Sequence, residues 1–124
     1  MSEPQPNKGI KRIYKAFIYS LDGFKACFRT EEAFRQEIYI AVILIPLAFW
    51  IGKGPVEHCL LVGSILLVLI VEMLNSAIER VVDRISTEKH DLSKEAKDMG
   101  SASVFIMVVL AAFIWVTIVA GKFL

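Results

Sequence analysis

The sequence predicts an all-α membrane protein, in which one N-terminal amphipathic surface helix precedes three transmembrane helices. The chain of 124 residues is 56% hydrophobic with a mean hydropathy of +0.58, which is too apolar for an ordinary soluble domain of this size. Most of its charges fall in residues 8–37 and 80–98, and they separate long apolar runs. We therefore expect residues 1–124 to form a single membrane domain. The net charge of +1 gives no reason to expect a nucleic-acid partner.

The surface helix is predicted over residues 8–29. Its apolar residues recur at spacings of three and four, with basic residues between them, which is typical of an amphipathic helix in the membrane interface. The apolar positions are Ile10, Ile13, Tyr14, Phe17, Ile18, Leu21, Phe24 and Phe28. The alternative is a helix that packs on the core of the protein, and each interpretation can hold for a different stretch.

The first transmembrane helix is predicted over residues 32–51. Thr30 is the expected N-cap, because Glu31 and Glu32 follow it in the first turn, where the helix dipole favours acids. The apolar run 38–51 alone is short for a bilayer of roughly 30 Å, but the turns from Glu32 onward supply the missing length. The run ends at the turn sequence GKGP, residues 52–55.

The second and third transmembrane helices are predicted over residues 56–85 and 95–121. No proline or asparagine separates the apolar run 59–71 from Glu72, so one helix continues through both and extends beyond the membrane. A polar connection, residues 86–97, follows, and Ser93 is the expected N-cap of the last helix. Residues 99–120 carry no charge and form the clearest span.

The distribution of lysine and arginine predicts the orientation in the membrane. Seven of these residues precede or begin the first span and five lie in residues 80–98, against one in the 52–57 loop and one near the C-terminus. The positive-inside rule therefore places the N-terminus and the polar connection in the cytoplasm, and the C-terminus on the periplasmic side.

The second span carries a polar stripe, which we define as Glu72, Asn75, Ser76, Glu79 and Asp83. At 100° per residue these positions share one helix face. An ionisable group near bilayer depth is costly, so the stripe is a functional-site hypothesis. No basic residue lies within one turn of Glu72 on its own helix, which argues against a simple solvated ion pair there. For Asp83, pairing with a neighbouring cation on a solvated face is the simpler interpretation.

The residues alone leave two functions open. The sequence GKG at 52–54 lacks the phosphate-loop pattern, the chain has no HRD or DFG signature, and His58 and His90 lack metal-ligand spacing. Carboxylates suit Mg²⁺, which takes one or two of them together with nucleotide phosphates, and a partly desolvated carboxylate can accept a proton from an alcohol. These features fit a membrane enzyme or an ion-coupled carrier.

Residues 72–83, EMLNSAIERVVD, resemble the E-x-L-N-[ST]-A-x-E-x-x-x-D signature of the prokaryotic integral-membrane diacylglycerol kinases. The resemblance extends to AFRQE at 33–37, to E-x-H at 88–90 and to AKDMGSA at 96–102. It implies a homotrimer in the bacterial inner membrane, with active sites shared between neighbouring subunits at the cytoplasmic face. The implied reaction transfers phosphate from ATP to diacylglycerol, with Mg²⁺ as cofactor and phosphatidic acid as product.

The resemblance also implies the role of individual residues. Glu72 matches the catalytic base, Asn75 matches a position that orients it or the phosphate, and Glu31 and Glu79 match the Mg²⁺ ligands. The matches to nucleotide contacts are Arg12, Tyr19, Glu31, Glu79, Glu88, His90, Lys97 and Asp98. The matches to lipid contacts are Arg12, Ser20, Ala33, Phe34, Arg35, Gln36, Glu37, Trp50, Glu72 and Ser101. The small residues from Gly100 onward are expected to allow close helix approach in a packed oligomer.

Three alternatives remain beside this expectation. Some members of the same family phosphorylate undecaprenol instead of diacylglycerol. A small ion-coupled transporter would use Glu72 as its proton or cation site. In a purely structural membrane oligomer, the polar stripe would have no chemical role.

Overall fold

The computed structural model describes residues 8–85 and 88–124, which form four α-helices. They are α1 (Ile10–Thr30), α2 (Glu32–Ile51), α3 (Gly54–Ile85) and α4 (Asp91–Phe123). Three of them, α2, α3 and α4, are long and apolar enough to cross a membrane. The structure thus confirms the all-α class and the three candidate spans. The first two residues of the expected polar connection, 86 and 87, lie outside the described residues.

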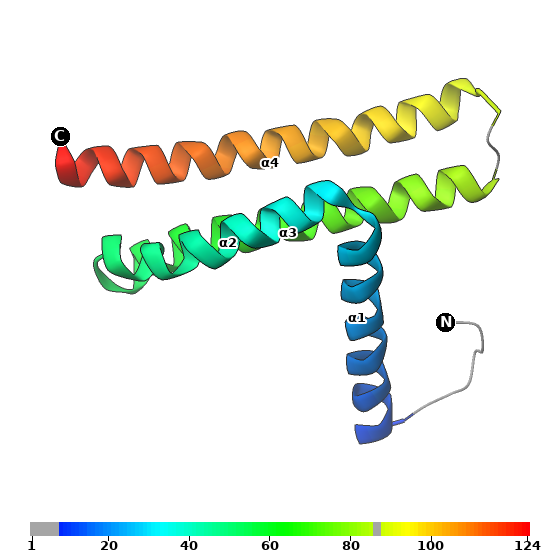
Figure 1. Ribbon diagram of the computed structural model, residues 1–124, viewed down its shortest axis with the longest axis horizontal. Coiled ribbons are helices and arrows are strands. Elements are labelled where there is room, and N and C mark those ends of the chain that lie inside the picture. Colours follow the sequence, from blue (N-terminus) through cyan, green and yellow to red (C-terminus); the bar gives the residue numbers. More distant parts are fainter. Residues whose placement is uncertain (1–7, 86–87) are drawn as a thin grey trace.

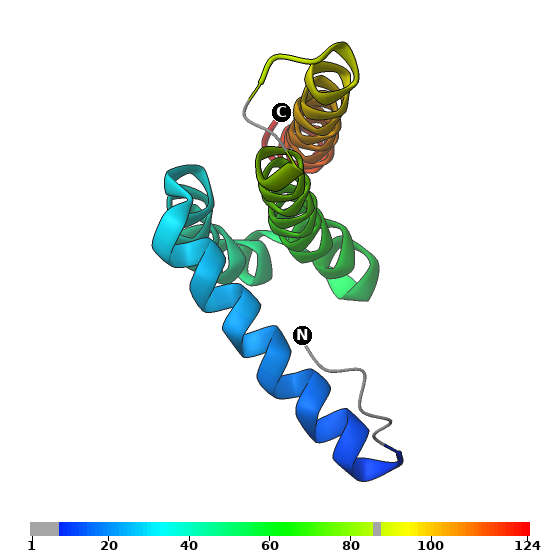
Figure 2. The same cartoon turned by 90° about the vertical axis from the view of Figure 1, so that its right-hand side faces the viewer.

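The three long helices run side by side, with α3 in contact with both α2 and α4 (Figures 1 and 2). Small and medium side chains fill the contact, including Ala41, Ala48, Leu61, Met107 and Ala111. Small residues let membrane helices approach closely, where dispersion and polar contacts hold them together. The helix that carries the polar stripe is therefore the central one.

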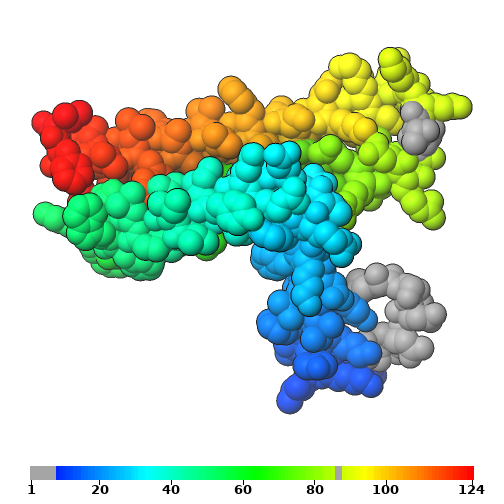
Figure 3. Space-filling view, viewed as in Figure 1, coloured from blue at the N-terminus to red at the C-terminus, as the bar shows by residue number. Residues whose placement is uncertain are grey.

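Helix α1 leaves the bundle as a separate arm and, within the described residues, packs against it near its C-terminal end (Figure 3). There the ring of Phe24 lies 6.4 Å from that of Phe34, which is fully buried, and the ring of Phe28 lies 6.2 Å from that of Tyr39. Toward the N-terminus, Ile10 and the apolar residues that follow it are exposed. The C-terminal turns of α1 thus pack on the protein, while its N-terminal half leaves an apolar face free.

Two expected helix caps are wrong. Thr30 ends α1, and its hydroxyl donates to the Ala26 carbonyl at 2.7 Å, so that Glu31 becomes the N-cap position of α2. A threonine that finds a carbonyl four residues back is no longer available to cap the next helix. Helix α4 begins at Asp91, before Ser93, because His90 Nδ1 accepts a hydrogen bond from the Leu92 amide at 3.1 Å.

Helix length sets the depth of the polar stripe. Helix α3 begins at Gly54, two residues before the expected start, directly after a turn at Gly52 and Lys53. Glu72 lies about 27 Å along the helix from Gly54, and Glu79 about 10 Å farther, at 1.5 Å per residue. If the turn lies at one boundary of the roughly 30 Å hydrocarbon layer, Glu72 lies close to the other boundary and Glu79 lies beyond it.

Candidate functional site

The polar stripe becomes more exposed along α3. Glu72 is only 7% exposed and Ser76 is buried, Asn75 and Glu79 are half-buried, and Asp83 is exposed. Asn75 Nδ2 donates to Glu79 Oε1 at 3.1 Å, which links two of the expected site residues. The carboxylates of the stripe therefore range from the nearly buried Glu72 to the solvent-exposed Asp83.

Two further carboxylates reach the stripe from other elements and complete what we call the acidic cluster, Glu31, Glu37, Glu72 and Glu79. The charges of Glu31 and Glu79 act on Glu72, and that of Glu72 acts on Glu37. Within the described residues, Arg80 is the one cation that forms an ion pair with this cluster, through Glu31 at 3.8 Å. Like charges in a poorly hydrated place repel each other, so the cluster favours a proton or a cation.

Asn75 of α3 lies against Gly100 of α4. Gly100 of α4 is buried, and a Cβ atom at this position would collide with Asn75 Oδ1. The same oxygen is buried and has no hydrogen-bond partner among the described residues. The structure thus accounts for one of the expected small residues of α4, and it leaves the Asn75 carbonyl oxygen available to a donor.

A polar cavity of about 450 Å³, here called the connection cavity, lies where α3 ends and α4 begins. Lys97 Nζ lies 2.6 Å from Asp83 Oδ1 across it, and Lys94 Nζ lies 2.6 Å from Asp98 Oδ2. The cavity brings together four of the expected nucleotide contacts, which are Glu88, His90, Lys97 and Asp98. Ammonium donors around a cavity of this size suit phosphate groups.

The charge pairs differ in part from those that the sequence suggests. Asp83 pairs with Lys97 of α4 and not with Arg84, its neighbour in the chain, while Asp98 pairs with Lys94, one turn away on the same helix. Arg80 turns toward Glu31 instead of Glu79. The i to i+4 spacing of Lys94 and Asp98 is a signal that sequence reasoning could have used, whereas the Arg80 contact joins residues far apart in the chain.

Glu31 and Glu79 fit a role in holding Mg²⁺. Carboxylate oxygens are suitable ligands, and one oxygen of Glu79 remains free of the bond to Asn75. Across residues 8–85 and 88–124, no group of three or more histidine, cysteine, aspartate or glutamate side chains is arranged to hold a metal. Two carboxylates together with phosphate oxygens form a donor set that Mg²⁺ commonly takes.

Several expected contacts lie away from both groups. Arg12, Tyr19 and Ser20 are exposed on α1, and no hydrogen bond or ion pair between described residues joins them to the acidic cluster or to the connection cavity. Trp50 is 80% exposed at the opposite end of the bundle. Of the other expected lipid contacts, Ala33, Gln36 and Ser101 are also exposed, whereas Phe34 is fully buried and Arg35 is half-buried.

An apolar groove of about 420 Å³ runs along the bundle from the acidic cluster. Glu37 is its one charged lining residue, and side chains from α2, α3 and α4 form the rest, among them Leu44, Val68 and Trp115. Glu37 Oε1 is buried and has no hydrogen-bond partner within the described part of the chain. The groove depends on three helices meeting, which the sequence alone does not predict.

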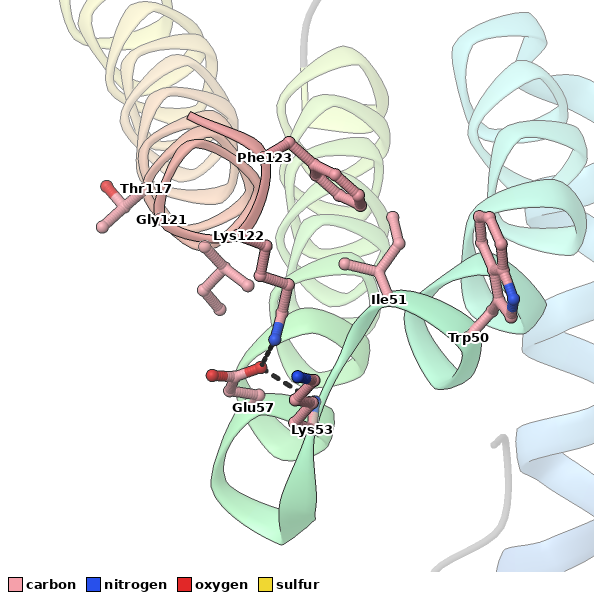
Figure 4. A pocket seen from close by; sticks show the side chains of 9 residues that line it. Trp50, Ile51, Lys53, Glu57, Thr117, Gly121, Lys122 and Phe123 are labelled. Atoms are coloured by element: carbon pink, nitrogen blue, oxygen red, sulfur yellow. Dashed lines mark hydrogen bonds and ion pairs between the residues drawn. The ribbon is translucent and has the colours of Figure 1, made fainter.

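A second polar cluster, the tip cluster, lies at the other end of the bundle and comprises Gly52, Lys53, Glu57, His58 and Lys122. Figure 4 shows Lys53, Glu57 and Lys122 of this cluster. Glu57 Oε1 accepts a hydrogen bond from the Lys53 amide and pairs with Lys122 Nζ, both at 2.8 Å. His58 Nε2 lies at hydrogen-bond distance, 2.8 Å, from the Gly52 carbonyl. These groups satisfy each other and join the end of α4 to the turn between α2 and α3.

Comparisons with known proteins agree on one family. Residues 18–119 match the family model described as prokaryotic diacylglycerol kinase. A Pseudomonas aeruginosa diacylglycerol kinase is 51% identical over 95% of this chain and 98% of its own length. The diacylglycerol kinases of Haemophilus influenzae and Escherichia coli K12 are 50% and 45% identical, over 86% and 93% of this chain and 91% and 94% of their own lengths.

Proposed function

Because the chain belongs to the prokaryotic diacylglycerol kinase family, we propose that its acidic cluster and connection cavity form one site that transfers phosphate from ATP to diacylglycerol. The chain is an ATP-dependent diacylglycerol kinase, similar to the three bacterial diacylglycerol kinases described above over nearly its whole length. The residue assignment rests on one observation: solvent exposure increases along α3, from the nearly buried carboxylate of Glu72 to the cavity beside Asp83.

Glu72 is the proposed general base. Its depth near the boundary of the hydrocarbon suits the primary hydroxyl of diacylglycerol, whose acyl chains keep it at the interface. In-line phosphoryl transfer depends mainly on positioning and charge neutralisation, so Glu72 aligns the hydroxyl and takes its proton as the oxygen attacks the γ-phosphorus. The bond from that phosphorus to the β,γ-bridging oxygen breaks at the same time, and ADP leaves with its electron pair. Asn75, fixed between Glu79 and Gly100, orients the reacting groups.

ATP is proposed to occupy the connection cavity. Lys97 exchanges Asp83 for phosphate oxygens, and Glu88, His90 and Asp98 contact the rest of the nucleotide. Glu31 and Glu79 hold Mg²⁺, which when bound neutralises charge on the β- and γ-phosphates. The separation of about 10 Å along α3 between Glu72 and Glu79 leaves room for the phosphates between the base and the nucleotide.

The lipid is proposed to enter from the side of the bundle. The apolar groove below Glu37 suits an acyl chain that extends toward Trp50, which lies about 20 Å from Glu37 along α2. An acyl chain in this groove would explain why expected lipid contacts, Glu37 and Trp50, lie at opposite ends of α2. Arg12, Tyr19 and Ser20 reach neither substrate within one chain, which supports a site completed by a neighbouring subunit.

The assembly is proposed to be a homotrimer with its sites at the cytoplasmic face of the bacterial inner membrane. The distribution of lysine and arginine supports this orientation, with the C-terminus in the periplasm. The buried oxygens of Glu37 and Asn75 that lack partners within the described chain support contacts from a substrate or a second subunit.

The test is a mixed-micelle assay with labelled ATP and either diacylglycerol or undecaprenol as acceptor. We expect Mg²⁺-dependent phosphatidic acid, and little product with undecaprenol. Preferential phosphorylation of undecaprenol would assign the other branch of the family. Substrate accumulation in vesicles without ATP, in the absence of any phosphorylated lipid, would instead support a transporter.

A further inference from the structure

One residue, Glu31, separates α1 from α2, and it belongs to the acidic cluster. Helix α1 ends at Thr30, α2 begins at Glu32, and Glu31 has an extended backbone (φ −110°, ψ 108°). We call residues 30–32 the elbow. Because Glu31 is the elbow residue itself, the position of its carboxylate depends on how firmly α1 is held.

Two arginines hold the end of α1. Arg35 of α2 donates from Nη1 to the carbonyls of Phe28 and Arg29, at 2.9 and 3.0 Å. Arg80 of α3 reaches the same end, where its Nη2 lies 3.4 Å from the Ala26 carbonyl, donates to the Thr30 hydroxyl and pairs with Glu31. Guanidinium groups at a helix C-terminus satisfy its free carbonyls and complement its dipole.

The two arginines fix the elbow relative to different helices. Arg35 lies on α2, so it fixes the elbow only relative to the next helix in the chain. Arg80 lies one residue after Glu79 on α3, so it fixes the elbow relative to the helix that carries Glu72 and Glu79. An exposed ion pair at 3.8 Å is weak by itself, but a planar guanidinium that bridges three acceptors restricts both partners.

We propose that Arg80 is a positioning residue of the phosphoryl-transfer site, which holds the elbow on α3 and so keeps the Glu31 carboxylate beside Glu72 and Glu79. This proposal rests on the proposed function, since that function gives Glu31 its role at the nucleotide. In the free protein, the guanidinium also offsets repulsion within the acidic cluster. Arg80 itself touches neither substrate.

Cys27 provides a readout of the elbow that does not depend on activity. It lies one turn before the elbow, is only 4% exposed, and is held near Ser76 and Arg80 of α3. Burial raises the pKa of the Cys27 thiol, an effect that the Ser76 hydroxyl only partly offsets. A thiol that is buried and mostly protonated reacts slowly with maleimides, and it reacts faster when the elbow opens.

The experiment uses the full chain in detergent with Cys59→Ala, so that Cys27 is the one remaining thiol. A water-soluble maleimide is applied to the parent, Arg80→Gln, Arg80→Lys and Arg84→Gln. Arg84 is the matched control, one turn farther along α3, exposed and without an ion pair to a described residue. The same four proteins are assayed for the KM of Mg-ATP and for kcat in mixed micelles.

We expect Arg80→Gln to label about tenfold faster, the effect of losing charge-assisted hydrogen bonds. Its KM for Mg-ATP should rise by a similar factor while kcat changes less. Arg80→Lys should fall between the parent and Arg80→Gln, because it keeps the charge but not the bridging geometry. Arg84→Gln should match the parent in both measurements.

Equal labelling of Arg80→Gln and Arg84→Gln would overturn the proposal, since the elbow would then not depend on Arg80. Faster labelling with an unchanged KM would overturn the positioning role, because Glu31 would then be held in some other way. If the parent itself made no phosphatidic acid, the proposed function would fail, while the labelling would still test whether Arg80 holds the elbow.

Discussion

The two ends of the bundle treat polar groups in opposite ways. At the tip cluster, Glu57 is paired with Lys122 and with the Lys53 amide, and His58 with the Gly52 carbonyl. At the acidic cluster, Glu72 is nearly buried without an ion pair to a described residue, and buried oxygens of Glu37 and Asn75 have no partner among those residues. Both ends lie on the same helices and use carboxylates of α3.

The difference distinguishes polar groups that stabilise the fold from polar groups that are left for chemistry. A buried polar group without a partner costs free energy, so a protein that can satisfy its carboxylates in one place and does not in another has a use for the second set. The tip cluster ties the helix ends together. In the proposed function, the acidic cluster keeps its oxygens available for substrates. The predictions below compare equivalent changes at the two ends.

The largest difference is expected for carboxylates of α3. Glu72→Gln should lower turnover by about a thousandfold, within the range of a lost general base, without disturbing assembly. Glu57→Gln is the matched control at the tip, and it should stay within about twofold of the parent rate. Turnover is measured as phosphatidic acid formed in mixed micelles, and assembly by size-exclusion chromatography. A near-normal rate for Glu72→Gln would refute its assignment as the base.

A smaller loss is expected for the cation of the connection cavity. Lys97→Met should raise the KM for ATP by about ten- to a hundredfold, the effect of one lost charge-assisted hydrogen bond to phosphate. The KM for diacylglycerol should change little, because the cavity lies beyond the lipid depth. Arg84→Gln removes a charge from α3 outside the cavity lining and serves as the control. Equal effects of the two variants would indicate a general loss of positive charge instead of a phosphate contact.

Gly100 tests whether Asn75 must be held in place. The Cβ atom of Gly100→Ala would collide with the end of a flexible side chain, so the amide can rotate away from Glu79 while the helices keep their packing. We expect turnover to fall by about tenfold, the effect of one misplaced hydrogen bond, with thermal stability nearly unchanged. Gly121→Ala is the control in the same helix, since its Cβ atom would meet nothing within 4 Å. Full activity of Gly100→Ala would show that the Asn75 orientation does not matter.

Much of the fold could be predicted from the sequence, because a membrane requires long uninterrupted apolar helices whose ends are marked by charge. The polar stripe was predictable for a related reason, since one continuous helix fixes which residues share a face. The connection cavity was not predicted, although most of its lining residues lie close together in the chain, at 88–98. The helix caps were not predictable, because the Thr30 and His90 side chains can each form more than one local hydrogen bond with the backbone, and the sequence does not indicate which one forms.

Contacts between distant segments could not be predicted. Arg80 has acidic neighbours along its own helix, and nothing in the sequence indicates that it turns to the end of α1. The pairing of Glu57 with Lys122 likewise requires the antiparallel return of α4. The same reason explains the apolar groove, to which three helices contribute. These features depend on how helices pack, whereas periodicity reports only on each helix alone.

The smallest effect on turnover is expected at the tip, where the matching glycine change should act on stability. The Cβ atom of Gly52→Ala would lie 2.7 Å from the His58 ring and 2.9 Å from the Ala48 carbonyl oxygen, and the carbonyl belongs to the backbone and cannot rotate away. We expect the variant to be destabilised by about 1–3 kcal/mol, as for other overpacked sites, with turnover per folded molecule unchanged. Gly121→Ala, at the same end of the bundle, again serves as the control. Thermal unfolding in detergent and the micelle assay measure the two quantities separately. A loss of turnover without a loss of stability at Gly52 would mean that the tip takes part in the chemistry, and the contrast between the two ends would then be wrong.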